Sequence, residues 1–209
     1  ASVENALADV TCFGAGGEQT IPGLTNGTLV LEGVFDSVPD TEIQAAVGVD
    51  QALTVTYGPL GFDLSDPAFL ASGDLSGYEI PSDVKNAVGF TATAMPNDSA
   101  LFGFSLHDLT AETATGDEAS HDGLAASTSG AVAHLHVTVA SAADTLDAKV
   151  QHSADDAVWV DLITFTQVTA VTSERKTVAG TVNQYLRESH TIAGAAPSFT
   201  YAVAIARRP

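Results

Sequence analysis

The chain has 209 residues, of which 45% are hydrophobic, and it carries a formal net charge of −19. This length and hydrophobic content are sufficient for a substantial core, formed as one large domain or two small ones. No apolar run is long enough to cross a membrane, and the first residues lack the basic region and hydrophobic core of a secretory signal. We therefore expect a soluble protein without a membrane partner. The single cysteine, Cys12, excludes an internal disulfide framework and a cysteine-based zinc site.

The charge is distributed unevenly along the chain. Residues 1–130 contain 19 acidic side chains and one basic side chain, whereas residues 131–209 contain 7 acidic and 6 basic ones, which gives −18 and −1. Affinity for DNA comes largely from Lys and Arg, so such an acidic part would repel phosphates and specific nucleic-acid binding is not expected. Two interpretations of the acidity remain open. It is typical of proteins that work in concentrated salt, as in a halophilic archaeal host, and also of ordinary acidic soluble proteins.

The first part of the chain predicts strands, short helical segments and one long loop. Residues 58–81 are rich in Gly, Pro and Asp and predict a loop, which carries the apolar side chains Phe62, Phe69, Leu70 and Tyr78. Asp40 can cap the first helix. Residues 23–35 predict a turn at Asn26 and Gly27 followed by a strand. The other predicted elements are strands at 52–57, 89–95 and 100–109, a helix at 41–47, and a helical turn at 82–89.

Residues 110–130 are small, polar and turn-rich, which predicts a linker or an exposed hairpin tip. We therefore predict two domains, 1–125 and 126–209. Short strands follow at regular spacing, which is the pattern of an antiparallel sandwich or jelly roll. The overall prediction is a mainly antiparallel all-β fold with one or two short helices. The predicted C-terminal strands are 131–140, 145–153, 158–165, 175–182, 183–192 and 198–207.

The stretch 150–162 predicts a hairpin with Asp155 and Asp156 in its turn and Trp159, the only tryptophan, on its return strand. A tryptophan on a sheet surface could stack on a sugar ring, but in a sandwich it more often belongs to the core. The core interpretation is the one we adopt. The predicted core residues of the sandwich are Trp159, Tyr185, Leu186 and Phe199.

Three runs in the C-terminal part carry a family resemblance: VQHSADDAVW, GTVNQYLR and FTYAVAIAR. They resemble the C-terminal part of the major tail (tail tube) proteins of long-tailed viruses of bacteria and archaea. The matching positions are Gln151, His152, Ser153, Asp155, Trp159, Gly180, Thr181, Val182, Tyr185, Leu186, Arg187, Phe199, Val203, Ala206 and Arg207. The same hairpin and the YLR strand also resemble discoidin-like jelly rolls that bind glycans.

The tail-tube resemblance implies a virion structural protein that is assembled in the host cytoplasm and located in the tail. It implies rings, usually hexamers, which stack into a tube, contact other tail proteins, and let the genome DNA pass without specific binding. Residues 1–125 would then form an acidic β-barrel or sandwich domain for assembly. Residues 126–209 would form an outward-facing β-sandwich. Phe62, Phe69, Leu70 and Tyr78 would contact the next ring. The discoidin-like resemblance implies instead a capsid decoration or a receptor- or glycan-binding module.

Motifs of enzymes and cofactor sites are absent from the sequence, so we expect neither catalysis nor a cofactor. His134 and His136 are two residues apart on a predicted strand and therefore project from one face, as two metal ligands must. His152 is a third candidate ligand, if it lies on a neighbouring strand. Two histidines on a solvent-exposed face are more common than a metal site, so we expect no metal here. His107 and Asp108 are adjacent and predict opposite faces of a strand, which disfavours a catalytic dyad.

Overall fold

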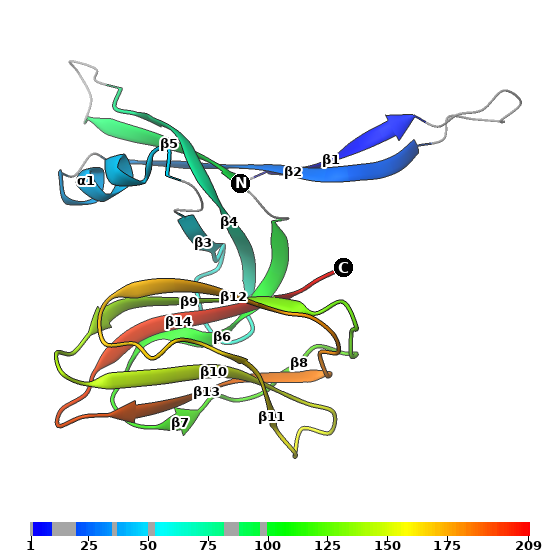
Figure 1. Ribbon diagram of the computed structural model, residues 1–209, viewed down its shortest axis with the longest axis vertical. Helices are drawn as coiled ribbons and strands as arrows, with labels where there is room; N and C mark the ends of the chain where they lie inside the picture. The colour runs from blue at the N-terminus through cyan, green and yellow to red at the C-terminus, as the bar shows by residue number, and fades with distance from the viewer. Residues whose placement is uncertain (1, 10–19, 35–36, 50–52, 82–87, 97–99) are drawn as a thin grey trace, which may run out of the picture. The chain divides into compact units, whose positions relative to one another are not determined.

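The computed structural model describes residues 2–9, 20–34, 37–49, 53–81, 88–96 and 100–209 (Figure 1). Within these ranges the chain is an antiparallel all-β protein with one short helix, which confirms the predicted fold class. The chain divides into two compact units. The first unit comprises Ala1–Leu53 and Ala71–Ala100, and the second comprises Thr54–Leu70 and Leu101–Pro209.

This division does not coincide with the predicted boundary at 125/126. Strand β6 (Leu101–Glu112) pairs with β14 (Phe199–Arg207) from Glu112 to Phe104, so it belongs to the C-terminal sandwich. The predicted linker 110–130 also contributes to that sandwich. Its short strands β7 (Gly116–Asp117) and β8 (His121–Asp122) both pair with β13 (Tyr185–Ala193).

The first unit is built around the long strand β2. The N-terminal part of β2 pairs with β1 from Ser2↔Thr28 to Asp9↔Thr20, and its C-terminal part pairs with β5 from Leu29↔Ala94 to Val34↔Gly89. The turn predicted at Asn26 and Gly27 is wrong, because both residues pair with β1 inside the strand. Strand β5 pairs in turn with the second half of β4. The predicted helical turn 82–89 falls almost entirely outside the described residues. The elements of this unit are β1 (Ser2–Asp9), β2 (Thr20–Val34), α1 (Ser37–Ala46), β5 (Gly89–Pro96) and the end of β4 (Pro67–Glu79).

The predicted loop 58–81 is wrong over most of its length, because β4 occupies Pro67–Glu79. Near the start of this strand four consecutive residues, 68–71, are buried. Its later part is polar and contains glycine, and there the pairing with β5 has an irregularity between Leu75 and Gly77. Residues 58–66 and 80–81 remain outside a strand, and the longer segment is closed by backbone hydrogen bonds from the Gly61 N–H to the Gly58 carbonyl and from the Asp66 N–H to the Asp63 carbonyl. The many Gly and Asp residues that predicted a loop are thus carried by an irregular strand.

The second unit is a β-sandwich (Figure 1). One layer contains the start of β4, then β6, β14, β9 and β12, and the other contains β11, β10 and β13 with β7 and β8. All six strands predicted for residues 131–209 are present, and two have the predicted bounds. The six strands are β9 (Ala131–Ala140), β10 (Thr145–Ser153), β11 (Val160–Thr164), β12 (Thr172–Val178), β13 (Tyr185–Ala193) and β14 (Phe199–Arg207). The short strand β3 (Leu53–Tyr57) pairs with β4.

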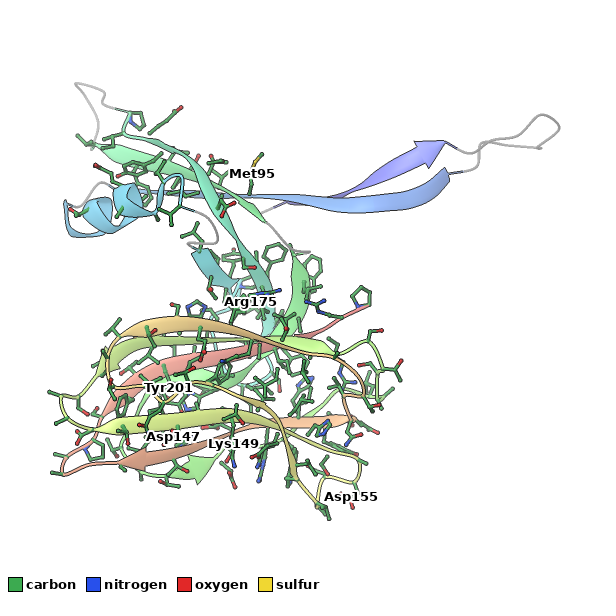
Figure 2. All side chains as sticks on the ribbon, in the orientation of Figure 1. Met95, Asp147, Lys149, Asp155, Arg175 and Tyr201 are labelled. Atoms are coloured by element: carbon green, nitrogen blue, oxygen red, sulfur yellow. The ribbon has the colours of Figure 1, made fainter. Side chains whose placement is uncertain are left out.

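Strand β14 is buried on both faces. Its large side chains point into the sandwich core, where Tyr201 lies between the two layers (Figure 2). Its alanines face the other way, and two of them, Ala204 and Ala206, pack with Ala68, Leu70 and Leu101. Small residues on the outer face allow the start of β4 to approach, while large residues on the inner face fill the core. The residues that alternate along β14 are Phe199, Tyr201, Val203 and Ile205 on the inner face, and Ala202, Ala204 and Ala206 on the outer face.

We predict that Gly103→Ala destabilises the second unit. A Cβ at Gly103 would overlap the carbonyl group of Ile205 on the neighbouring strand β14. Overpacking of this kind costs about 1–3 kcal/mol. Gly77→Ala on β4 is the matched control, since its added Cβ would meet no atom within 4 Å. Urea unfolding of both variants checks the prediction, and equal stabilities would contradict it.

Candidate functional site

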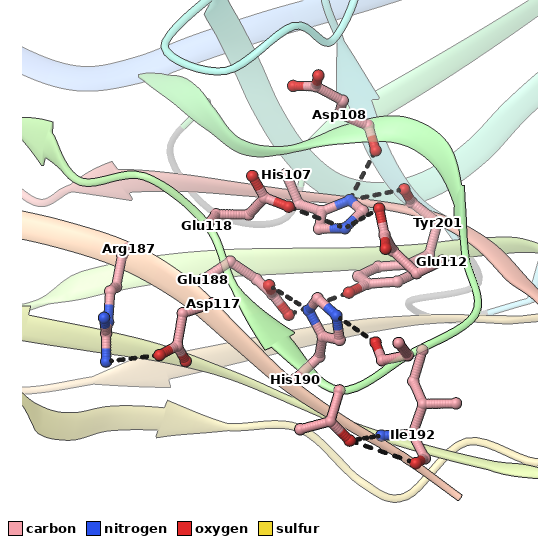
Figure 3. A network of polar contacts seen from close by, with 12 residues as sticks. His107, Asp108, Glu112, Asp117, Glu118, Arg187, Glu188, His190, Ile192 and Tyr201 are labelled. Carbon is pink, nitrogen blue, oxygen red and sulfur yellow. Dashed lines mark hydrogen bonds and ion pairs between the residues drawn. The ribbon is translucent and has the colours of Figure 1, made fainter.

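A group of polar side chains lies between the layers of the sandwich (Figure 3). It combines two histidines, three glutamates and a tyrosine from β6, β13, β14 and the segment that follows β6. Four of the side chains are at most 3% exposed, which is unusual for ionisable groups. We call this group the His–Glu cluster. Its members are His107, Glu112, Glu118, Glu188, His190 and Tyr201.

Glu188 and His190 project from the same face of β13 because they are two residues apart. His190 Nε2 donates to the Ala114 carbonyl at 3.0 Å, and His190 Nδ1 lies 3.0 Å from Glu188 Oε2. A proton must occupy this second contact, either on His190 or on Glu188. Burial raises the pKa of Glu188. Burial lowers the pKa of His190, but the hydrogen bond and charge of Glu188 outweigh it, so the pKa of His190 is raised overall.

His107 has one satisfied ring nitrogen and one unsatisfied one. Its Nδ1 lies 2.6 Å from the Asp108 carbonyl and 3.2 Å from the Tyr201 carbonyl, and since carbonyls only accept, Nδ1 carries a proton. The ring stacks on Tyr201 with centroids 3.9 Å apart, which fixes its orientation. Its Nε2 is buried and has no hydrogen-bond partner. That nitrogen points at two carboxylates, with 3.6 Å to Glu118 Oε1 and 3.9 Å to Glu112 Oε1.

Glu112 and Glu118 connect the cluster to solvent. Their side chains are 30% and 27% exposed, whereas His107 is fully buried. Burial raises the pKa of Glu118, and the negative charges of Glu112 and Asp108 raise it further. Carboxylates are therefore crowded together at this edge of the cluster, next to the buried imidazole ring of His107.

Two sets of three side chains in the His–Glu cluster could hold a metal ion. In each set the ligand atoms lie within 4.8 Å of one another. One set is His107, Glu188 and His190, and the other is His107, Glu112 and Glu118. The sequence analysis missed both sets. The E-x-H spacing of Glu188 and His190 on a predicted strand was the available signal, but nothing in the sequence links it to His107.

The structure places His134 and His136 on one face of β9, as predicted. His152 does not lie on a strand next to them. Both rings contact the Thr56 hydroxyl, at 3.0 Å from His134 Nδ1 and 2.9 Å from His136 Nε2. This face of β9 is opposite to the sandwich core, because Ala133, Leu135 and Val137 point into that core. His152 lies on β10 in the other layer and accepts a hydrogen bond from the Asn183 N–H. The three histidines therefore do not share a metal site.

We predict that acid destabilises the second unit through His134. Burial, followed by the charges of His136 and Arg175, lowers the pKa of His134 to about 3. The pKa of His134 is thus lower in the folded state than the value of 6.5 in the unfolded state. Neutral His134 therefore contributes its full free energy of folding above pH 6.5, and this stability is lost as the pH falls from 6.5 towards 3. Between about pH 7 and about pH 5 the loss is about 2 kcal/mol, at about 1.4 kcal/mol per unit.

Urea unfolding at the two pH values measures this loss. His134→Gln keeps a hydrogen-bonding side chain but cannot gain a proton, so its stability should fall less over the same interval. An identical pH dependence in the wild type and in His134→Gln would contradict the assignment.

The predicted core residues differ in burial. Leu186 and Phe199 are fully buried in the core, whereas Trp159 and Tyr185 are half-buried. Trp159 precedes β11, and the Arg187 guanidinium lies over its ring, 4.4 Å from the centroid. Arg187 is held in turn by Gln151 Oε1, at 2.9 and 2.8 Å. One face of the tryptophan is thus closed by a protein side chain.

The predicted Asp155 turn is present. Its Oδ1 accepts hydrogen bonds from the backbone N–H groups of Ala157 and Val158 and from the Ser153 hydroxyl. Those bonds lower the pKa of Asp155. The carboxylate therefore organises the turn, as expected for aspartate in such a position.

The four predicted inter-ring side chains are not equally available for contact with another subunit. Phe69 and Leu70 are buried, at 7% and 1% exposed, while Phe62 and Tyr78 are half-buried. The Phe69 ring packs edge-on against Phe102, with centroids 5.4 Å apart. Phe102 itself is 77% exposed. The inter-ring role of the four residues stays a prediction, and Phe102 is an exposed aromatic that was not among them.

Among the helices of the described residues, none has the length and apolar character to span a bilayer. Comparison with known proteins adds little. No protein-family profile and no curated protein matches the chain. A solved structure that matches is the Dit (gp 19.1) protein of SPP1, described as a paradigm of the hub adsorption apparatus in phages that infect Gram-positive bacteria. The match has 12% identity and a TM-score of 0.29, and it covers 98% of this chain and 88% of the other.

Proposed function

We propose that the protein is a structural subunit of a virion tail, which assembles into rings, of the hexameric type, that stack into a tail tube. The sequence resemblance of the C-terminal strands to tail tube proteins supports this role. The observation that carries it is the β1–β2 hairpin of the first unit. The proposal includes contacts with other tail proteins and passage of the genome without specific binding. It includes no catalysis.

The hairpin lacks pairing partners on both sides within the described part of the chain. In the described part of the chain, strand β1 pairs only with β2, and the pairing of β2 with β5 begins at Leu29. Thr20–Thr28 and Ser2–Asp9 therefore form an isolated two-stranded ribbon. Such a ribbon is at best marginally stable in water, and unpaired edges invite pairing with another chain. Closure of a ring supplies such a partner for every subunit at once.

Exposed apolar side chains in the second unit support subunit contacts as well. Phe102 and Leu60 are 77% and 74% exposed, and Tyr57 is 52% exposed. Large aromatic and aliphatic groups of this kind contribute much of the binding energy at protein interfaces when a partner covers them. Tyr57 lies on β3, Leu60 in the following loop and Phe102 on β6, and all three belong to the second unit.

The negative charge suits a channel that passes DNA. Residues 1–130 carry −18 and offer phosphates almost no Lys or Arg. The same charge opposes the approach of identical subunits. Salt screens this repulsion, because the Debye length falls from about 10 Å at 0.1 M to about 3 Å at 1 M. Assembly should therefore strengthen as the salt concentration rises.

The alternative from the sequence, a glycan-binding decoration module, would need an open aromatic surface at Trp159. The ring is half-buried and Arg187 covers one of its faces. For this reason we favour assembly as the function of the chain.

We predict that the purified protein forms rings or tubes with an open channel, in amounts that increase from low to molar salt. Removal of residues 1–19 deletes β1 and should abolish rings, because the ribbon that pairs subunits is lost. The second unit contains none of the deleted residues, so its circular dichroism signal should persist. Negative-stain electron microscopy across salt concentrations checks this. Small compact particles of the wild type at every salt concentration would refute the assembly role.

We also predict that Phe102→Ser weakens assembly without unfolding the protein. Loss of an interface aromatic at a hot spot costs about 2 kcal/mol or more, which corresponds to roughly 30-fold weaker association. Val158→Ser is the matched control, since Val158 is 69% exposed and lies in the turn before β11. Sedimentation velocity at high salt measures association. Equal effects of the two substitutions would show that Phe102 has no special role.

A further inference from the structure

The His–Glu cluster contains a ligand atom without a partner, His107 Nε2. Both of its near neighbours are carboxylate oxygens at 3.6 and 3.9 Å, which is too long for a hydrogen bond. A neutral imidazole whose Nδ1 carries the proton presents a lone pair at Nε2. In the fully buried His107, Nε2 faces the carboxylates of Glu112 and Glu118. The three ligand atoms converge on one point, which a cation could occupy when Nε2 carries no proton.

We propose that a divalent transition-metal cation of the zinc class binds at this point, held by His107 Nε2, Glu112 and Glu118. Zinc binds imidazole nitrogen and carboxylate oxygen at about 2.0–2.2 Å, so two of its ligand atoms at a tetrahedral angle are about 3.3–3.5 Å apart. The separations of 3.6 and 3.9 Å need only small side-chain movements to reach that spacing. Both glutamates are partly exposed and can make such movements.

The surroundings of His107 also suit a metal ligand. A metal-bound histidine usually donates its other N–H to a carbonyl or carboxylate, which fixes the tautomer and the ring orientation. His107 Nδ1 has two carbonyl acceptors, those of Asp108 and Tyr201. The stack on Tyr201 holds the ring plane in place. The ring is thus oriented with its free nitrogen towards the carboxylates before any cation arrives.

The ligand set distinguishes between classes of cation. One imidazole and two carboxylates suit zinc and neighbouring transition metals, whereas calcium and magnesium take oxygen ligands. Three protein ligands leave a fourth position, which water can fill through the exposed side of Glu112 and Glu118. A second set of ligand atoms, from His107, Glu188 and His190, lies beside the first. Both ring nitrogens of His190 already have hydrogen-bond partners, so the set with Glu112 and Glu118 is the one available to a metal.

A metal at this position would tie the two layers of the sandwich together. His107 and Glu112 belong to β6 in one layer, while Glu118 follows β7, which pairs with β13 in the other. Glu118 N–H also donates to the Glu188 carbonyl, which attaches this segment to β13. The role of the metal would be structural, as a clamp on the crossing from β6 to β7. It is independent of whether the protein forms rings.

The test measures zinc and cobalt binding by the full-length chain with Cys12→Ser, which removes its only thiol. Isothermal titration should give one equivalent of Zn²⁺ per chain, and His107→Gln or Glu118→Gln should weaken binding by about 100-fold or more. Bound Co²⁺ should show the absorption of a nitrogen- and oxygen-ligated tetrahedral ion. His136→Gln is the matched control, because it alters the other histidine pair and should leave zinc affinity unchanged.

Three results would overturn the proposal. One is a wild type that binds zinc no more tightly than His107→Gln. A second is a loss of affinity that follows His136→Gln instead of the cluster variants. The third is a nitrogen-15 spectrum in which excess zinc leaves the His107 Nε2 resonance unshifted. Because Glu118 is partly exposed, Glu118→Gln should remain folded, so the test stays decisive even if His107→Gln does not fold.

Discussion

The burial of β14 on both faces is the constraint on which the second unit depends. Its inner face supplies four large side chains to the core, and its alanine-lined outer face accepts the start of β4. Strand β14 also pairs with both β6 and β9. Any change that alters its register therefore affects the core, the outer cover and two neighbouring strands together. The tight approach of β6 at Gly103 follows from this position.

The same strand brings an ionisable cluster into the interior. Tyr201 lies between the layers, where its ring supports His107 and its hydroxyl donates to Glu188. Fully buried carboxylates are destabilising unless protons or cations compensate their charge. Glu188 has His190 as its partner, while Glu112 and Glu118 face His107 Nε2, which has no hydrogen-bond partner. A resident cation would turn this edge from a region of crowded negative charge into a link between the layers.

The strand pattern of the C-terminal part could be predicted because its alternation has the period of two that a half-buried strand requires. Strand β4 could not, because Gly and Asp inside an irregular strand have the same composition as a loop. The His–Glu cluster could not be predicted either. Alternation along β6 places neighbours such as His107 and Asp108 on opposite faces, but the register with β14 shifts twice between Tyr201 and Ala204. Ser105, Leu106 and His107 are consequently all buried, and local sequence does not indicate such shifts.

The account of function depends on whether the open edge of the β1–β2 ribbon finds its partner in another subunit. Cryo-electron microscopy of particles prepared at high salt tests this most directly, because main-chain pairing is visible once strands are resolved. The account predicts a ring in which β1 or the first half of β2 pairs with a strand of the adjacent subunit. A ring in which the ribbon makes no contact between subunits, or particles that contain only single chains, would contradict it.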